Sequence, residues 1–77
     1  ELDAYIEKYA KGRTLARISK IAKAVMRISI YEMLYIDDIP ASVSINEAGE
    51  LAKQYDDDKT KAFVNGILNA VKEELGK

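Results

Sequence analysis

Residues 24–36 constrain the fold of this chain more than any other segment, because apolar residues occupy almost every side of the helix that they predict. A helix that is apolar all round is usually buried on all sides. The chain has only 77 residues, and it has no Cys with which to form a disulfide. A domain of this size is close to the lower limit for a self-sufficient core. We therefore expect an uncovered apolar face, which a second copy of the chain or a separate N-terminal piece would bury.

Four helices are predicted, over residues 2–11, 19–36, 43–55 and 59–75. Apolar residues recur at every third or fourth position, and no segment alternates with the period of two that is typical of a strand. Ser44 and Glu47 have the spacing of a capping box, with Ser42 as an alternative N-cap for the third helix. The residues expected to face inward from the last two helices are Ile45, Ala48, Leu51, Ala52, Phe63, Val64, Ile67, Leu68, Val71 and Leu75. The predicted fold class is all-α, a small bundle of four main helices.

Charge is unevenly distributed along a chain whose net charge is only −1. Between residues 8 and 27 there are seven basic residues and no acidic one: Lys8, Lys11, Arg13, Arg17, Lys20, Lys23 and Arg27. A solvated helix face explains such a segment as well as contact with an anionic partner does. Among anionic partners, RNA is the leading candidate.

Aromatic residues beside basic residues give the candidate RNA-binding positions. Phe63 lies in the last predicted helix beside Lys59 and Lys61, where its ring either packs in the core or stacks on a base. Tyr9, next to Lys8, is a second candidate, although core packing explains it at least as well. Stacking on an aromatic ring with cations nearby is the usual way in which proteins bind single-stranded RNA.

Several polar residues sit among apolar neighbours in the predicted helices, namely Arg27, Asn46, Glu47, Asn65 and Gly66. Burying a polar group without a partner costs about 1–3 kcal/mol, so such residues are expected to be hydrogen-bonded in a structural polar core. We expect Arg27 and Glu47 to bracket the second and third helices as an ion pair. Gly66 has no Cβ, so it is expected to allow two helices to approach closely.

The composition excludes several classes of function. Without His or Cys, and without a Gly-rich phosphate loop, the chain offers no nucleophile beside a base, so we expect neither an enzyme nor a cofactor. Residues 56–58 are all Asp; they could hold a hard cation, but a solvated helix cap is the commoner role. No apolar run approaches the roughly 20 residues that span a bilayer, so a cytoplasmic protein without membrane contact is expected.

The chain resembles a known family over nearly its whole length. The matching segments are residues 24–34 (Ala-Val-Met-Arg-Ile-Ser-Ile-Tyr-Glu-Met-Leu), 38–40 (Asp-Ile-Pro), 44–48 (Ser-Ile-Asn-Glu-Ala), 50–53 and 63–68 (Phe-Val-Asn-Gly-Ile-Leu). In order and spacing they are similar to the C-terminal half of NusB, a family of bacterial transcription antitermination factors. The resemblance implies that residues 1–77 form the C-terminal half of a NusB-like helical domain. It also implies binding of single-stranded boxA-type RNA with the small-subunit ribosomal protein NusE, within the RNA polymerase antitermination complex. The Phe that matches Phe63 lies at the RNA face of the family.

The resemblance has two departures and leaves two alternatives. The family's arginine-rich N-terminal half is absent, so the chain is expected to be a fragment or a truncated form. Ala22 stands where the family often has an acid on the ribosomal-protein side. One alternative is the NusB-like domain of a ribosomal RNA cytosine methyltransferase, although Gly66 and Asn69 favour the antitermination factor. The other is a purely structural helical interaction module.

Overall fold

A computed structural model describes residues 2–10, 18–36 and 38–77, and these residues form four helices and no strand. Their bounds are α1 (Leu2–Tyr9), α2 (Lys20–Tyr35), α3 (Ala41–Tyr55) and α4 (Asp58–Glu74). The all-α class and the four predicted helices are confirmed. The basic residues Lys11, Arg13 and Arg17 and the first Asp of the 37–38 pair lie outside the described residues.

Side-chain caps fix where two of the helices begin. The Ser19 hydroxyl accepts a hydrogen bond from the Ala22 backbone N–H at 3.0 Å and so caps α2. The Asp57 carboxylate accepts one from the Thr60 N–H at 2.7 Å and caps α4. Each of these side chains satisfies a backbone donor that the first turn of a helix leaves unpaired. Both cap types follow from the sequence, because Ser and Asp are the residues that favour this position.

The third helix begins differently from the prediction. Pro40 occupies the N-cap of α3 without a side-chain hydrogen bond, and the helix starts at Ala41. The predicted capping box of Ser44 and Glu47 is therefore wrong, and so is the alternative cap at Ser42. Ser44 lies one turn inside the helix and is buried.

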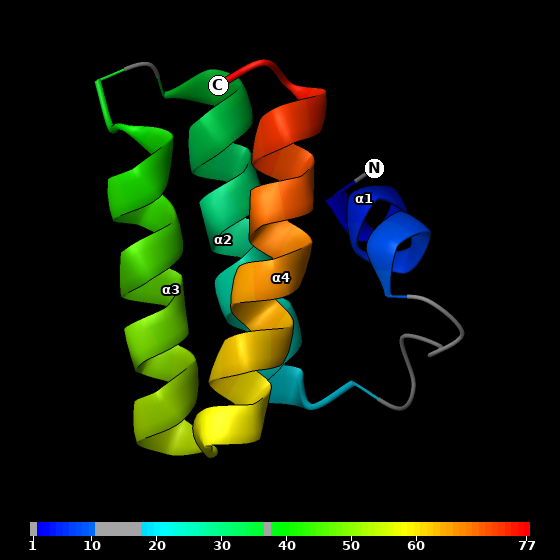
Figure 1. The fold of residues 1–77 in the computed structure, drawn as a ribbon, viewed down its shortest axis with the longest axis vertical. Coiled ribbons are helices and arrows are strands. Elements are labelled where there is room, and N and C mark those ends of the chain that lie inside the picture. The colour runs from blue at the N-terminus through cyan, green and yellow to red at the C-terminus, as the bar shows by residue number, and fades with distance from the viewer. Residues whose placement is uncertain (1, 11–17, 37) are drawn as a thin grey trace.

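Helices α2, α3 and α4 run side by side along the long axis of the molecule, whereas the short α1 lies against α2 and α4 at one edge (Figure 1). The closest association is between α3 and α4. The Cα atoms span 30 × 24 × 15 Å. Because packed helices lie about 8–10 Å apart, a thickness of 15 Å accommodates two layers of helices and no more. No helix of this molecule can therefore be enclosed on every side by the described residues.

The core lies where α2, α3 and α4 meet, with one contribution from α1. Its fully buried large side chains include Ile6, Met26, Ile30, Met33, Val64, Leu68 and Val71. At the α2–α3 contact the hydroxyls of Ser29 and Ser44 are hydrogen-bonded at 2.8 Å, and Ser44 also donates to Glu32 at 2.7 Å. These buried hydroxyls satisfy each other, so they add little penalty to the apolar core.

An uncovered apolar face is present, as the apolar pattern of residues 24–36 in a short chain predicted. Its exposed side chains come from α2 and α3: Ile21, Ile28, Tyr31, Tyr35, Val43, Leu51 and Tyr55. The prediction that Leu51 faces inward is wrong, since its side chain is 41 % exposed. Helix α2 buries one side only, and its opposite stripe follows the same helical spacing as the buried one. Tyr31 and Tyr35 pack together on this stripe, with ring centroids 5.0 Å apart.

The predicted structural polar core is largely wrong. Arg27, Asn46, Glu47 and Gly66 are exposed, and only Asn65 is half-buried. Instead of pairing with Glu47, the Arg27 guanidinium binds both carboxylate oxygens of Asp3, at 2.6 and 2.9 Å, and so joins α2 to α1. The physical reason is rotation about the helix axis: apolar neighbours in sequence do not place a residue on the apolar side.

Candidate nucleic-acid interface

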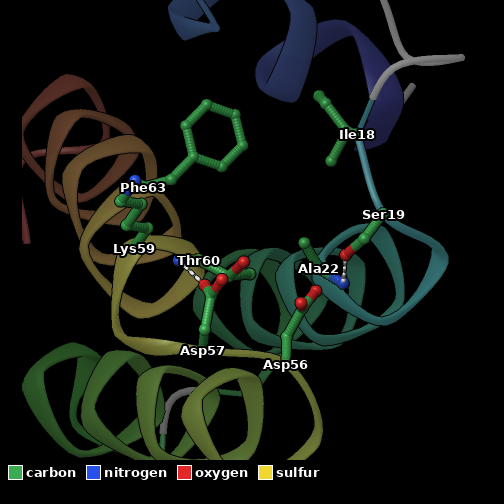
Figure 2. Close-up of a pocket in the computed structure, with 8 residues that line it drawn as sticks. All are labelled: Ile18, Ser19, Ala22, Asp56, Asp57, Lys59, Thr60 and Phe63. Carbon is green, nitrogen blue, oxygen red and sulfur yellow. Dashed lines mark hydrogen bonds between the residues drawn. The ribbon is translucent and has the colours of Figure 1, made fainter.

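Phe63 lies at the boundary between two cavities, near the first turns of α4. Its side chain is half-buried and packs against the core. The first cavity has a volume of about 290 Å³ and is lined by Ile18, Ser19, Ala22, Asp56, Asp57, Lys59, Thr60 and Phe63. In Figure 2 the side chains of Phe63 and Ile18 point toward each other across the opening of this cavity. Ala22 is buried beneath it.

The apolar and charged parts of the first cavity come from different segments. Phe63 and Lys59 stand four residues apart on α4, so they project from the same side of the helix. The carboxylates of Asp56 and Asp57 come from the turn between α3 and α4 (Figure 2). The hydrogen bond from the Thr60 backbone N–H holds the pKa of Asp57 below its usual value, because that bond favours the ionised carboxylate. The cavity therefore combines an aromatic wall with both signs of charge.

The second cavity lies on the other side of Phe63, between α1 and α4. Its volume is about 650 Å³, and it is lined by Tyr9, Ala10, Ala62, Phe63, Gly66, Ile67 and Ala70. The structure thus brings together two predicted stacking residues, Phe63 and Tyr9, although they are far apart in sequence. Gly66 contributes an open surface here, since a Cβ at this position would meet nothing within 4 Å. The expectation that Gly66 permits close helix approach is wrong.

Glu74 engages both Lys8 and Tyr9. The Lys8 ammonium donates to Glu74 at 2.7 Å, and the Tyr9 hydroxyl donates to the same carboxylate oxygen. The Lys8 ammonium also lies 5.3 Å from the centre of the Tyr9 ring. These bonds lower the pKa of Glu74 and raise the pKa of Lys8 and of Tyr9, because each favours the charged carboxylate and the protonated donor.

Lys61 is separated from this group. Its ammonium binds the Glu50 carboxylate at 2.6 Å and so bridges α3 and α4. That contact raises the pKa of Lys61 and lowers the pKa of Glu50. Among the predicted RNA-binding residues, the structure therefore places Lys59 and Tyr9 beside Phe63, but it places Lys61 on another flank of α4.

Most residues of the first cavity were not among the predicted RNA-binding residues, namely Ile18, Ser19, Ala22, Asp56, Asp57 and Thr60. Two of these, Ile18 and Asp56, line the cavity opposite Phe63 and come from the segment before α2 and from the turn after α3. A sequence signal existed only for the α4 side, in the spacing of Lys59 and Phe63. Nothing in the sequence pattern indicates that residues 18 and 56 line the same cavity as residue 63, because their positions depend on how three helices pack.

Within the described ranges, no group of three or more Asp or Glu residues is arranged so that it could hold a metal ion. Residues 56–58 are therefore not gathered around a common point, and Asp57 acts as a helix cap. No helix in the described part of the chain is long and apolar enough to span a membrane.

The amino-acid sequence of this helical bundle matches a known family. The profile of the NusB family matches residues 1–73. The transcription antitermination protein NusB of Acetivibrio thermocellus is 54 % identical over 71 residues, covering 92 % of this chain and 49 % of the relative. The protein of the same name from Ruminiclostridium cellulolyticum is 59 % identical over 70 residues, covering 91 % of this chain and 48 % of the relative. That of Natranaerobius thermophilus is 46 % identical over 77 residues, covering the whole chain and 55 % of the relative.

The chain belongs to the NusB family. It spans about half the length of the curated relatives that it matches. No solved structure matches it significantly.

Proposed function

We propose that this chain takes part in transcription antitermination by binding single-stranded boxA-type RNA together with the small-subunit ribosomal protein NusE. Membership of the NusB family supports the process, and the relatives reported above carry the antitermination name. The observation that carries RNA binding is the cavity shared by Phe63 and Lys59. A base stacks on the Phe63 ring, and the Lys59 ammonium binds a neighbouring phosphate.

Charge sets the form of this interaction. A net charge of −1 gives little long-range attraction for RNA, so affinity depends on local contacts. Lys59 is exposed at the rim of the cavity, whereas the ammonium of Lys61 already binds Glu50. Tyr9 offers a second stacking surface across Phe63, with Lys8 beside its ring. We therefore assign the main phosphate contact to Lys59.

The test is a comparison of single substitutions in RNA-binding assays. Phe63→Ala should weaken binding of a short single-stranded RNA by about 1–3 kcal/mol, the usual contribution of one stacked base. Lys59→Ala should lower the slope of log affinity against log salt by about one unit. Lys61→Ala is the matched control from the same helix, and it should leave that slope nearly unchanged.

Stability must be measured in parallel, because Phe63 also packs against the core. Truncating a fully buried Phe costs about 3–5 kcal/mol, and a half-buried one should cost less. The melting temperature of Phe63→Ala gives the range of temperatures in which the variant is folded. The RNA affinities of the variant and the native chain are compared within that range. Unchanged RNA affinity in the folded variant would remove Phe63 from the interface and defeat the proposal.

A second candidate function is a helical interaction module, which the uncovered apolar face on α2 and α3 favours. Ile28 and Tyr31 are 58 % and 50 % exposed on this face. Large exposed apolar patches usually mark a contact with another protein or a second copy. A stable self-association should bury more than about 1,000 Å² in total. Sedimentation that shows only a folded monomer at tens of micromolar, roughly the range of a weak dimer, would exclude the homodimer.

A further inference from the structure

Those of the described residues that line the first cavity carry more negative charge than an RNA-binding site would be expected to have. Among the described residues its lining has two carboxylates, Asp56 and Asp57, and one ammonium, Lys59. Carboxylates repel the phosphate groups of a backbone, so the interior of this cavity does not suit a phosphate. They accept hydrogen bonds from amino groups, which bases carry at their edges.

The two carboxylates differ in what they already bind. One oxygen of Asp57 accepts the Thr60 N–H at 2.7 Å, and this bond is the N-cap of α4. Asp56 is exposed, and among the described residues none donates a hydrogen bond to its carboxylate. Figure 2 shows the Asp56 side chain reaching from the α3–α4 turn toward Ser19, across the cavity from Phe63. Both carboxylate oxygens of Asp56 can thus accept from a ligand, whereas one oxygen of Asp57 already holds the first turn of α4.

We propose that the cavity selects a base that carries an exocyclic amino group, with Phe63 as the stacking wall and Asp56 as the hydrogen-bond acceptor. This inference rests on the proposed RNA-binding function and deepens it. Cytosine fits the arrangement, because its N4 amino group donates to a carboxylate. Uracil does not fit as well, because it presents a carbonyl oxygen at that position, which the carboxylate repels. Lys59, one turn before Phe63, binds the phosphate next to the selected base.

A comparison of cytidine with uridine tests the proposal. Their bases have nearly the same shape but differ at the position where cytosine has its N4 amino group and uracil has a carbonyl oxygen. The probes are a short oligouridylate and the same oligomer with one central cytidine. The native chain should bind the cytidine-containing oligomer about tenfold more tightly, as expected for one hydrogen bond to a charged group. In Asp56→Ala the ratio of the two affinities should fall to about one.

Asp58→Asn is the matched control. Asp58 is the first residue of α4, carries the same charge as Asp56 and does not line the cavity; its side chain is 83 % exposed and lies 3.8 Å from the Lys53 ammonium. Losing this charge should strengthen binding of both oligomers equally and leave their ratio unchanged. Asp56→Asn provides a further check, since an amide donates to the uracil carbonyl as well as accepting from cytosine. In that variant the preference for cytidine should shrink.

The outcomes separate this inference from the proposed function. If Phe63→Ala weakens both oligomers while the native chain shows no cytidine preference, RNA binding stands and the role of Asp56 is wrong. A cytidine preference that survives in Asp56→Ala also overturns the inference. If neither oligomer binds, or if Phe63→Ala changes nothing, the proposed function fails and the inference fails with it. Weaker binding of an arginine-containing peptide to Asp56→Ala, with the RNA ratio unchanged, would instead assign the cavity to a protein partner.

Discussion

Helix α1 and the three long helices are held in the molecule by different interactions. Between α3 and α4 the contact is mainly apolar, built from fully buried side chains such as Ala52, Val64 and Leu68. Helix α1 contributes one fully buried large residue, Ile6, and its partly buried Leu2, Tyr5 and Tyr9 also pack against the core. It adds charged contacts near its two ends. These are Asp3 with Arg27 at one end, and Lys8 and Tyr9 with Glu74 at the other.

This difference shows that different interactions stabilise different parts of this short chain. Apolar burial contributes about 25 cal/mol per Å² and does not depend on protonation, whereas exposed ion pairs weaken with salt and with protonation. The three long helices should therefore behave as one cooperative unit. Helix α1 should open more easily than that unit, and it should do so under conditions that leave the unit folded. The second cavity would then lose its Tyr9 wall while Phe63 stays in place.

The largest effect is expected from truncating a core residue of the long helices. Leu68→Ala should lower the free energy of unfolding by about 2–5 kcal/mol, because it leaves a cavity among α2, α3 and α4. Ile6 is equally buried, yet Ile6→Ala should mainly free α1. Denaturant unfolding followed by circular dichroism measures the first effect, and amide hydrogen exchange resolves the second. Equal loss of protection in α1 and α4 in both variants would show that the molecule is a single unit and that the distinction is wrong.

A smaller effect concerns how closely α3 and α4 approach. A Cβ added at Gly49 would lie 2.4 Å from the Asn65 side-chain oxygen, which is buried and has no hydrogen-bond partner among the described residues. Gly49→Ala should cost about 1–3 kcal/mol for overpacking, against a gain of about 1 kcal/mol in helix propensity. The net change should be a loss of about 1 kcal/mol. Thermal unfolding measures it.

Gly66→Ala is the matched control for this substitution. Nothing lies within 4 Å of a Cβ at Gly66, so only the propensity gain of about 1 kcal/mol should remain. In an Asn65→Ala background the obstacle to a Cβ at residue 49 is gone, and Gly49→Ala should then be stabilising. If Gly49→Ala stabilises the native chain as well, Asn65 moves aside without cost and the α3–α4 contact is not closely fitted.

These two glycines also show what the sequence could predict and what it could not. Helices are local, so the spacing of apolar residues and the predicted cap among residues 56–58 located them within a few residues. Helices α3 and α4 approach closely at Gly49, whereas the sequence indicated Gly66. The residues that a glycine faces on a neighbouring helix cannot be read from the sequence of its own helix. The same reason explains Arg27, which binds Asp3 of α1 rather than Glu47 of α3.

The candidate site also has residues that the sequence pattern indicates and residues that only the packing of the helices brings in. Phe63 and Lys59 share one side of α4, which their spacing of four residues indicates. Ile18 forms the wall opposite Phe63, and Asp56 is the proposed hydrogen-bond acceptor for the base. Those two residues enter the site only through the packing of α2, α3 and α4. Local patterns therefore predicted that an aromatic ring and a lysine share one side of α4, but they could not predict that Asp56 lines the same cavity.

The smallest effect is expected from pH, and it should be larger for α1 than for the α3–α4 contact. In that contact Glu50 also has a lowered pKa, but fully buried apolar side chains such as Ala52 and Leu68 remain at any pH. Arg27 lowers the pKa of Asp3, and Lys8 with Tyr9 lowers the pKa of Glu74. A carboxyl group whose pKa is lowered in the folded state stabilises that state above its unfolded pKa, about 4, and the contribution disappears as pH falls through the folded value. The raised pKa of Lys8 and of Tyr9 works in the opposite direction: it stabilises below about 10 and is lost as pH rises further. Helix α1 should thus be most firmly attached between about pH 4 and about pH 10.

Nuclear magnetic resonance can follow both contacts in one titration. Cross-peaks between Ile6 and α4 report the attachment of α1, and cross-peaks between Ala52 and α4 report the apolar contact. On acidification below about pH 4 the α1 signals should weaken first, and added salt should shift the change toward neutral pH by screening the ion pairs. Asp3→Asn should produce part of this weakening already at neutral pH, since it removes the partner of Arg27. Simultaneous loss of both sets of signals would mean that apolar contacts, rather than charges, hold α1 in place.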